Sequence, residues 1–134
     1  GQRHRWVLAS KVGNAMSSSP NESQYSRSWM LRACEDSLRR LDTDHLDIYY
    51  LHRDYNGMNL EEPLRAIEAL LRDGKIRYWG VSNFRGWRIA EVVHLCRALG
   101  VPPPVVPGTR PALIPDVDMS VLSAAKVKSP LRTV

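Results

Sequence analysis

Three apolar runs in this 134-residue chain end in side chains that can ionise or form hydrogen bonds. Lys11 lies at the end of the first run, His52 at the end of the second, and Ser82 with Asn83 at the end of the third. An ammonium group can hold a neighbouring acid in its ionised form, an imidazole can donate or accept a proton, and hydroxyl and amide groups can orient a polar ligand. If the three runs end at one place in the fold, these side chains form one candidate site.

Each of these residues also has an ordinary structural explanation. A lysine at a strand end is usually solvated or paired with an acid, and a histidine after an apolar strand is usually a hydrogen-bonded core residue. A Ser-Asn pair before an aromatic residue commonly forms a turn or a helix cap. The prediction of a site therefore rests on their joint placement and on no single residue.

The apolar runs have the length and composition of buried strands. They cover Trp6–Val12, Leu46–His52 and Ile76–Asn83, and a fourth run starts with Val105–Val106 after three prolines. Such short runs, bounded by turn residues, are typical of strands in a sheet that is covered on both faces. The stretch Asn14–Ser28, rich in Ser, Asn and Pro, predicts a loop.

Three amphipathic helices are predicted between these strands. They span Trp29–Leu41, Leu60–Leu71 and Trp87–Leu99, where apolar residues recur at the helical period. The positions expected to face the core are Met30, Cys34, Leu38 and Leu41, then Leu60, Leu64, Ile67, Leu70 and Leu71, then Ile89, Val93, Cys96 and Leu99.

Start and stop signals flank these helices. Asn59 followed three residues later by Glu62 resembles a capping box, and Pro63 is tolerated in a first turn. Gly74 and Gly100 come directly after the apolar periods and are expected to end the second and third helices.

The resulting order, β-α-β-α-β-α-β, indicates an α/β fold with parallel strands joined by right-handed crossovers. A closed barrel and an open doubly wound sheet both satisfy this order. No G-x-G-x-x-G or G-x-x-x-x-G-K-[ST] motif follows any strand, which favours the barrel. A (β/α)8 barrel needs about 250 residues, so we expect a partial barrel, with the polar strand ends meeting at its carboxyl-terminal rim.

Composition and charge exclude several other classes of protein. The chain is 43% hydrophobic and 25% charged, as in ordinary globular domains, and has neither a long apolar span nor a secretory leader. We therefore expect a cytoplasmic protein with no membrane partner. Cys34 and Cys96 show no metal-binding spacing, so we expect two buried thiols, no disulfide framework and no metal site.

The net charge of +5 does not indicate a nucleic-acid partner, because acidic residues interleave with the basic ones. A solvated surface of mixed charge is the expected arrangement. The basic residues considered for it are Arg3, Arg5, Arg39, Arg40, Arg72, Lys75, Arg77, Arg85, Arg88, Lys126 and Lys128.

Three segments closely resemble the aldo-keto reductases, NAD(P)H-dependent oxidoreductases built on a TIM barrel. They are V-L-A-S-K-V at 7–12, S-L-R-R-L-D-T-D-H-L-D-I-Y-Y-L-H at 37–52 and G-K-I-R-Y-W-G-V-S-N-F at 74–84. By this resemblance, residues 1–106 correspond to the third to fifth β/α units of the barrel and the start of its sixth strand. Residues 107–134 match nothing in the family and are expected to form an irregular tail.

The resemblance implies a role for each residue of the candidate site. Lys11 corresponds to the lysine and His52 to the histidine of the family's Asp-Tyr-Lys-His tetrad, while Ser82 and Asn83 correspond to the pair that binds the nicotinamide carboxamide. The implied cofactor is NADPH or NADH, and the implied reaction is hydride transfer to a small aldehyde or ketone.

The same resemblance places the tetrad's aspartate and tyrosine before Lys11, and the phosphate-binding loops near the last strands of the barrel. Neither part is contained in this sequence, so we expect the isolated chain to be inactive. The alternative function is a non-catalytic regulatory or cofactor-binding module of the same fold.

A partial barrel leaves two sheet edges without partners and uncovers inward-facing residues such as Val7, Leu46, Ile48 and Tyr50. We therefore expect a loosely packed monomer, a homodimer or an aggregate, with self-association through the open edges.

Overall fold

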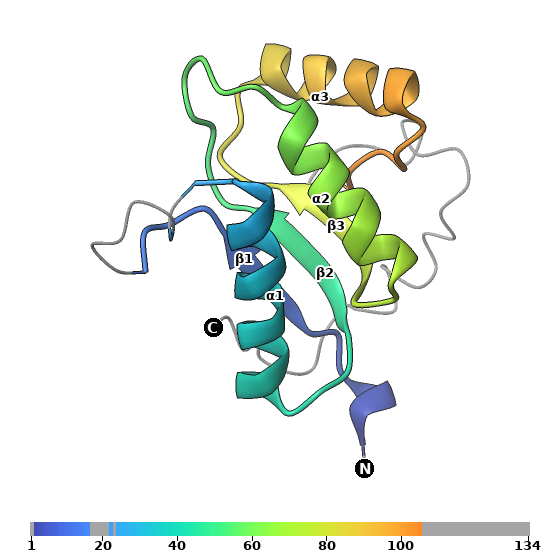
Figure 1. Cartoon of the computed structure of the whole chain (residues 1–134). Helices are drawn as coiled ribbons and strands as arrows, with labels where there is room; N and C mark the ends of the chain where they lie inside the picture. The colour runs from blue at the N-terminus through green and yellow to red at the C-terminus, as the bar shows by residue number, and fades with distance from the viewer. Residues whose placement is uncertain (1, 17–21, 23, 106–134) are drawn as a thin grey trace.

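A computed structural model describes residues 2–16, 22 and 24–105 of the chain. Strands and helices alternate along it, as the sequence predicts, after a short 3-10 helix at the start (Figure 1). The elements are η1 (Arg3–Arg5), β1 (Ala9–Val12), α1 (Arg27–Leu41), β2 (Leu46–Leu51), α2 (Glu61–Arg72), β3 (Ile76–Val81) and α3 (Gly86–Leu99). The predicted tail and Val106 lie outside the described residues.

The three strands form one parallel sheet in the order β1-β2-β3. Helices α1 and α2 lie in front of this sheet in Figure 1, and α3 lies across the end of α2. Val105 makes an isolated parallel bridge to Gly80 and donates its N–H to the Trp79 carbonyl at 2.7 Å. The fourth apolar run therefore begins to pair with β3, which fits a partial barrel.

The main core lies between the sheet and the helices. Its two largest fully buried side chains are Tyr49 and Trp79, whose polar atoms are both satisfied. The Tyr49 hydroxyl donates to the Met30 carbonyl at 3.2 Å, and Trp79 Nε1 donates to the Pro102 carbonyl at 2.8 Å. Both rings can therefore be fully buried without leaving a hydrogen-bond donor unpaired.

Side chains alternate between the two faces of the sheet. Tyr49 and Val81 face the helices, whereas Lys11, Tyr50 and Gly80 are aligned across the three strands on the opposite face. Of the residues expected to be uncovered on that face, Leu46 and Ile48 are in fact buried. Leu46 is part of the main core at the start of β2, while Val7 and Tyr50 are half-buried.

All three helices end in a left-handed residue that turns the chain toward the next strand. Gly74 and Gly100 have φ of 69° and 71°, as expected from the sequence, but α1 uses Asp42 at φ 50°. The N–H of the following residue reaches back to the last turn in each helix: Thr43 to Leu38, Lys75 to Leu70 and Val101 to Cys96. These are the hydrogen bonds of a Schellman motif.

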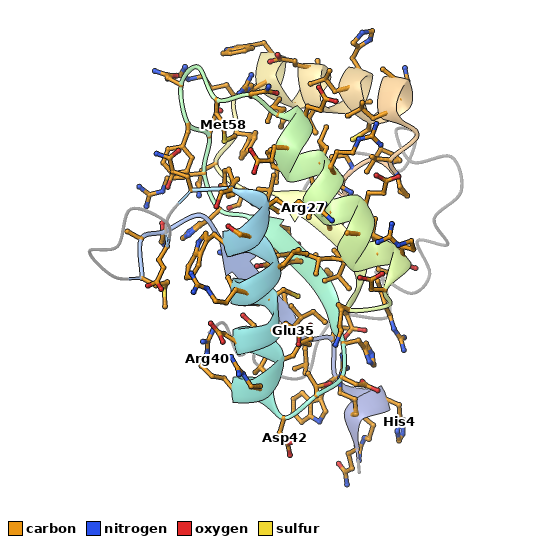
Figure 2. The ribbon with its side chains drawn as sticks, in the orientation of Figure 1. His4, Arg27, Glu35, Arg40, Asp42 and Met58 are labelled. Carbon is orange, nitrogen blue, oxygen red and sulfur yellow. The ribbon has the colours of Figure 1, made fainter. Side chains whose placement is uncertain are left out.

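The first helix begins two residues earlier than predicted, at Arg27, because its cap comes from another helix. Glu62 Oε1 accepts from the Arg27 N–H at 2.9 Å, so the predicted capping box is only half formed. Asn59 Oδ1 does cap its own helix, by accepting from the Glu61 N–H at 2.8 Å. Figure 2 shows Arg27 where α1 approaches α2.

The first strand is shorter than predicted, because the hydrogen bonds of Leu8 to β2 are irregular: its carbonyl accepts from both the Asp47 and the Ile48 N–H, at 2.9 and 3.2 Å. The Leu8 N–H donates to Asp47 Oδ2 at 2.8 Å, and Trp6 is 43% exposed. The second and third strands end one or two residues early, at Leu51 and Val81.

The third helix presents Val92 and not the predicted Val93 to the core, together with Cys96. Arg88, assigned to the solvated surface, is also buried on this face. Its guanidinium donates to Asp54 Oδ1, Glu91 Oε2 and the Met58 carbonyl, so the charge is paired as it is buried. The buried face of α3 therefore includes a salt-bridged arginine. Hydrophobic periodicity does not predict such a residue.

Cys34 and Cys96 are buried free thiols, as predicted. Burial raises the pKa of Cys34 to about 12 and that of Cys96 to about 11, so both are protonated at neutral pH. Across the described ranges, no helix has the length and apolar character to cross a membrane.

We expect Asp42→Gly to stabilise the protein by about 0.5–1 kcal/mol, because glycine adopts the left-handed conformation of this position without a Cβ penalty. Urea unfolding followed by circular dichroism measures the change. The matched control is Asp73→Gly at the end of α2, where φ is −80° and no strain is relieved. Equal effects of the two substitutions would contradict the explanation.

Candidate active site

The parallel register brings the predicted site residues to one end of the sheet. His52 directly follows β2, and its N–H donates to the Val12 carbonyl at 2.9 Å; Ser82 directly follows β3, and its N–H donates to the Leu51 carbonyl at 2.8 Å. Both residues are therefore fixed to the neighbouring strand through the backbone. Lys11, in β1, is paired with Tyr50 of β2, and the two residues lie on the same face of the sheet.

Asn83 links the ends of the second and third strands. Its Nδ2 donates to the His52 carbonyl at 2.9 Å and to Ser82 Oγ at 3.2 Å. The residue adopts φ of 58°, a conformation that Asn tolerates better than most residues. Asn83 thus turns the chain and joins His52 to Ser82 at the same time.

His52 is held in its neutral form at neutral pH. Its pKa is lowered first by burial and then by the positive charges of Lys11 and Arg53. Lys11 itself is exposed on β1. Lys11 and His52 line the same cleft, so the two predicted residues share one environment.

A further residue, Asn14, contacts the His52 ring and was assigned only to a loop by the sequence. Asn14 Nδ2 lies 2.8 Å from His52 Nδ1. Its only sequence signal is its position three residues after Lys11 and next to Gly13, where the chain must turn back over the strand ends.

Two tyrosines hold the loop after β1 against the loop after β2. Tyr25 donates from its hydroxyl to the Arg53 carbonyl at 2.6 Å and accepts from the Arg53 N–H at 2.9 Å, while the Tyr55 hydroxyl donates to the Gly13 carbonyl. Their rings meet edge to face with centroids 5.4 Å apart. Gly13 is required here, because its φ is 125° and a Cβ would lie 2.6 Å from the Tyr25 ring.

Gly80 leaves room for the next strand on the side of the sheet that carries Lys11. A Cβ at this position would lie 2.4 Å from the Val105 carbonyl oxygen and 2.7 Å from the Tyr50 ring. The absence of a side chain therefore lets Val105 approach β3 closely, and Tyr50 covers the remaining space.

Lys11, Asn14 and His52 line a cleft of about 680 Å³ along the outer edge of β1. Ser82 and Asn83 do not line it, but they adjoin it through the hydrogen bond to the His52 carbonyl. The other lining residues are Val12, Gly13, Met16, Glu22, Trp29, Arg32, Ala33, Asp36, Ser37 and Arg40.

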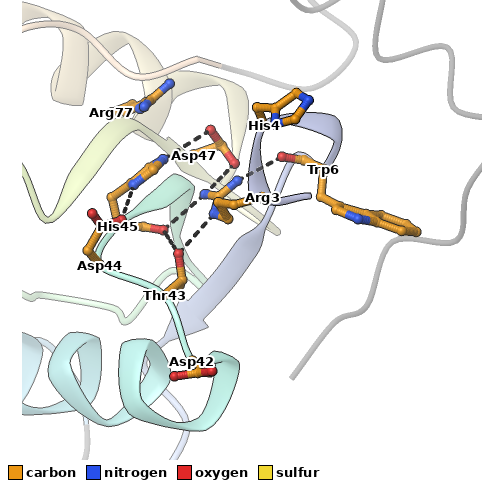
Figure 3. Close-up of a pocket in the computed structure, with 9 residues that line it drawn as sticks. All are labelled: Arg3, His4, Trp6, Asp42, Thr43, Asp44, His45, Asp47 and Arg77. Carbon is orange, nitrogen blue, oxygen red and sulfur yellow. Dashed lines mark hydrogen bonds and ion pairs between the residues drawn. The ribbon is translucent and has the colours of Figure 1, made fainter. Parts of the chain in front are cut away.

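A second pocket, of about 570 Å³, lies at the opposite end of the strands (Figure 3). Figure 2 shows His4 and Asp42 at this end, away from Met58. Arg3 is at its centre and donates to Thr43 Oγ1 at 2.9 Å, to the His45 carbonyl at 3.0 Å and to Asp47 Oδ2 at 2.8 Å.

The polar groups of this second pocket are paired with one another. Asp47 Oδ2 accepts from both Arg3 and the Leu8 N–H, and His45 Nδ1 lies 2.6 Å from Asp44 Oδ1. The hydrogen bond to His45 lowers the pKa of Asp44 below its usual range. Such mutual pairing at the amino ends of parallel strands indicates a role in stability, whereas the carboxyl ends hold the candidate site.

Within residues 2–16, 22 and 24–105, no three His, Cys, Asp or Glu side chains are grouped so that they could hold a metal ion. The residues assigned to the candidate site offer an ammonium (Lys11), an imidazole (His52), a hydroxyl (Ser82) and two amides (Asn14 and Asn83).

Comparison with known proteins identifies one family. The model of the Aldo/keto reductase family matches residues 1–107. The chain is 38% identical over 95 residues to the uncharacterized oxidoreductase YqkF of Bacillus subtilis, 39% identical over 66 residues to human aflatoxin B1 aldehyde reductase member 2, and 55% identical over 53 residues to the methylglyoxal reductase YeaE of Escherichia coli.

These matches cover 69%, 49% and 40% of this chain, respectively. The same matches cover 31%, 18% and 18% of the three relatives. The chain thus spans less than a third of the length of the relatives that it resembles.

We expect Asp47→Asn to destabilise the protein by about 1–3 kcal/mol, because the substitution removes the charge that pairs with Arg3 and binds the Leu8 N–H. Thermal and urea unfolding measure the loss. Asp73→Asn is the matched control and should change stability little, since Asp73 lies outside this pocket and its ion pair with the adjacent Arg72 is exposed. A comparable loss in the control would contradict the assignment of this network to stability.

Proposed function

This chain belongs to the aldo/keto reductase family, and we propose that it forms part of the active site of an NAD(P)H-dependent reductase of small aldehydes or ketones. The observation that carries the proposal is the joining of three strand ends. Lys11 and His52 line one cleft, and Asn83 Nδ2 donates to the His52 carbonyl. These contacts involve the residues that the family resemblance assigns to catalysis and cofactor binding.

The chemistry of hydride transfer fits the groups that this site offers. Negative charge grows on the carbonyl oxygen as the carbon is reduced, and a nearby donor that strengthens its hydrogen bond in the transition state lowers the barrier. In our proposal, neutral His52 donates a hydrogen bond to that oxygen and orients it. Lys11 would stabilise the ionised form of a neighbouring tyrosine, as an ammonium lowers the pKa of a phenol.

The residues present also fit a nicotinamide. When bound, this cofactor supplies the hydride. Ser82 Oγ accepts from Asn83 Nδ2, which leaves the hydroxyl proton of Ser82 to donate to a carboxamide oxygen. Asn83 is exposed, and its Oδ1 is an acceptor suited to the carboxamide NH₂. The two side chains together would fix the orientation of the nicotinamide ring.

The names of two relatives support a carbonyl substrate. One is an aldehyde reductase and another a methylglyoxal reductase. Both names describe reduction of carbonyl compounds, and we propose the same substrate class for the longer protein to which this segment would contribute.

We expect the isolated chain to show no reductase activity. The ten residues before Lys11 contain neither Tyr nor Asp, so the proton donor and its aspartate partner are not supplied from the position where the family resemblance places them. Loss of a general acid commonly lowers rates by about 10²- to 10⁴-fold. NADPH oxidation with a reactive aldehyde and the purified 134-residue chain measures this. Turnover that is abolished by Lys11→Met would contradict it.

We expect activity when the segment is placed in a complete barrel. The design takes residues 1–107 of this chain, the part that the family model matches, and substitutes them for the corresponding segment of the E. coli methylglyoxal reductase. Lys11→Met in the chimera should lower kcat by about 10²- to 10⁴-fold. Lys75→Met is the matched control and should leave kcat unchanged, because Lys75 directly precedes β3, at the end of the sheet opposite the candidate site, and pairs with Glu35. A folded chimera that is inactive, or equally active with Lys11→Met, would refute the proposed function.

We also propose that the open edge of β1 lets the isolated chain associate with itself. Among the described residues, β1 pairs on one side only, with β2. An edge strand presents unpaired N–H and C=O groups, which recruit other strands.

We therefore expect size-exclusion chromatography with light scattering to show dimers or larger species that dissociate on dilution. Ala9→Lys should reduce this association, because a charge on the inner face of an edge strand opposes pairing with another strand. A sharp monomer peak with cooperative melting and no binding of a hydrophobic dye would contradict the proposal.

A further inference from the structure

The contact between Asn14 and His52 determines which nitrogen of the His52 ring carries the proton, as well as where the ring lies. Asn14 Nδ2 lies 2.8 Å from His52 Nδ1. An amide nitrogen can only donate, so Nδ1 must accept, and the single proton of the neutral imidazole then lies on Nε2. We propose that Asn14 is a positioning residue that holds His52 in the Nε2–H form and so directs a hydrogen-bond donor into the candidate site. Its catalytic meaning rests on the proposed reductase function.

The loop that carries Asn14 is itself held in place. Gly13, directly before it, accepts a hydrogen bond from the Tyr55 hydroxyl, and the Tyr25 ring packs where a side chain at Gly13 would lie. Tyr25 in turn binds both backbone groups of Arg53, the residue after His52. Tyr25 and Tyr55 therefore hold the backbone next to both Asn14 and His52.

The charges around His52 favour the neutral ring, which the Nε2–H form requires. Lys11 on β1 and Arg53 after β2 both oppose a proton on the ring, while Asn83 after β3 binds the His52 carbonyl and not the ring. A doubly protonated ring would also point an Nδ1–H at the NH₂ group of Asn14. Burial, the two cations and the Asn14 amide therefore all disfavour the imidazolium.

The opposite orientation of the Asn14 amide defines the competing hypothesis. Asn14 Oδ1 is buried without a hydrogen-bond partner among the described residues. If the amide were reversed, this oxygen would accept from Nδ1–H, and Nε2 would present an acceptor to the site. Such a ring could not donate to a carbonyl oxygen. The two orientations thus predict opposite tautomers.

Long-range ¹H–¹⁵N NMR spectra of the 134-residue chain distinguish these tautomers. The chain has four histidines, and the signals of His52 are assigned by their loss in His52→Gln. We expect the Nε2–H form in the native sequence. Asn14→Asp should reverse the tautomer and raise the pKa of His52, because a carboxylate can only accept and attracts the cation.

Asn14→Leu gives a second test, because leucine offers the ring neither a donor nor an acceptor. The Nε2–H to Nδ1–H ratio should fall about five- to tenfold on loss of the hydrogen bond. Asn56→Asp is the matched control: Asn56 Oδ1 accepts from Arg85, and the same change there should leave the His52 tautomer unaltered. His94, exposed on α3, reports any general effect on the spectra.

An Nδ1–H tautomer in the native sequence, or an Nε2–H tautomer that persists in Asn14→Asp, would overturn the positioning role. The measurement needs neither cofactor nor substrate, so its outcome is independent of the reductase assay. An inactive chimera with the expected tautomers would refute the proposed function alone and leave the effect of Asn14 on His52 standing.

Discussion

The structure depends on β2 bonding to a parallel neighbour on each side. Because β1 and β3 both run in its direction, the three carboxyl ends come to the same edge of the sheet. The backbone bonds of His52 and Ser82 extend this register one residue beyond the strands. Residues more than 70 positions apart in the sequence, from Lys11 to Asn83, therefore lie at one edge of the sheet.

The register needs support from outside the sheet, because β1 has only four residues. Ser10, buried on the helix side, shares a 2.9 Å hydrogen bond with Ser37 of α1, and Ser37 also donates to the Ala33 carbonyl. Arg3 and Asp47 hold the chain before β1 against the start of β2. The short strand is thus fixed at its start and along its buried face, which keeps Lys11 on the opposite face.

How much of this was readable from the sequence depends on the range of each interaction. Helical periodicity predicted the three helices and short apolar runs predicted the three strands, while the strand ends predicted one site formed by Lys11, His52, Ser82 and Asn83. These patterns missed Arg88, whose buried charge is paired with Asp54 34 positions away, and they placed the partner of Glu62 within its own helix when it lies on α1. These errors share one cause: each polar side chain binds a partner that is distant in the sequence and is brought close only by the fold.

Asn14 is the case where this limitation bears on function. A loop asparagine next to glycine predicts a turn, and nothing in its neighbourhood specifies a histidine 38 positions later. The polar networks at the two ends of the sheet differ in whether their groups are all paired. At the amino ends, Arg3 and Asp47 pair with each other. At the carboxyl ends, the described part of the chain provides a hydrogen-bond partner for one ring nitrogen of His52, Nδ1. A network that leaves one nitrogen available can both fix a ring and present a donor, and that combination separates a site from a structural cluster.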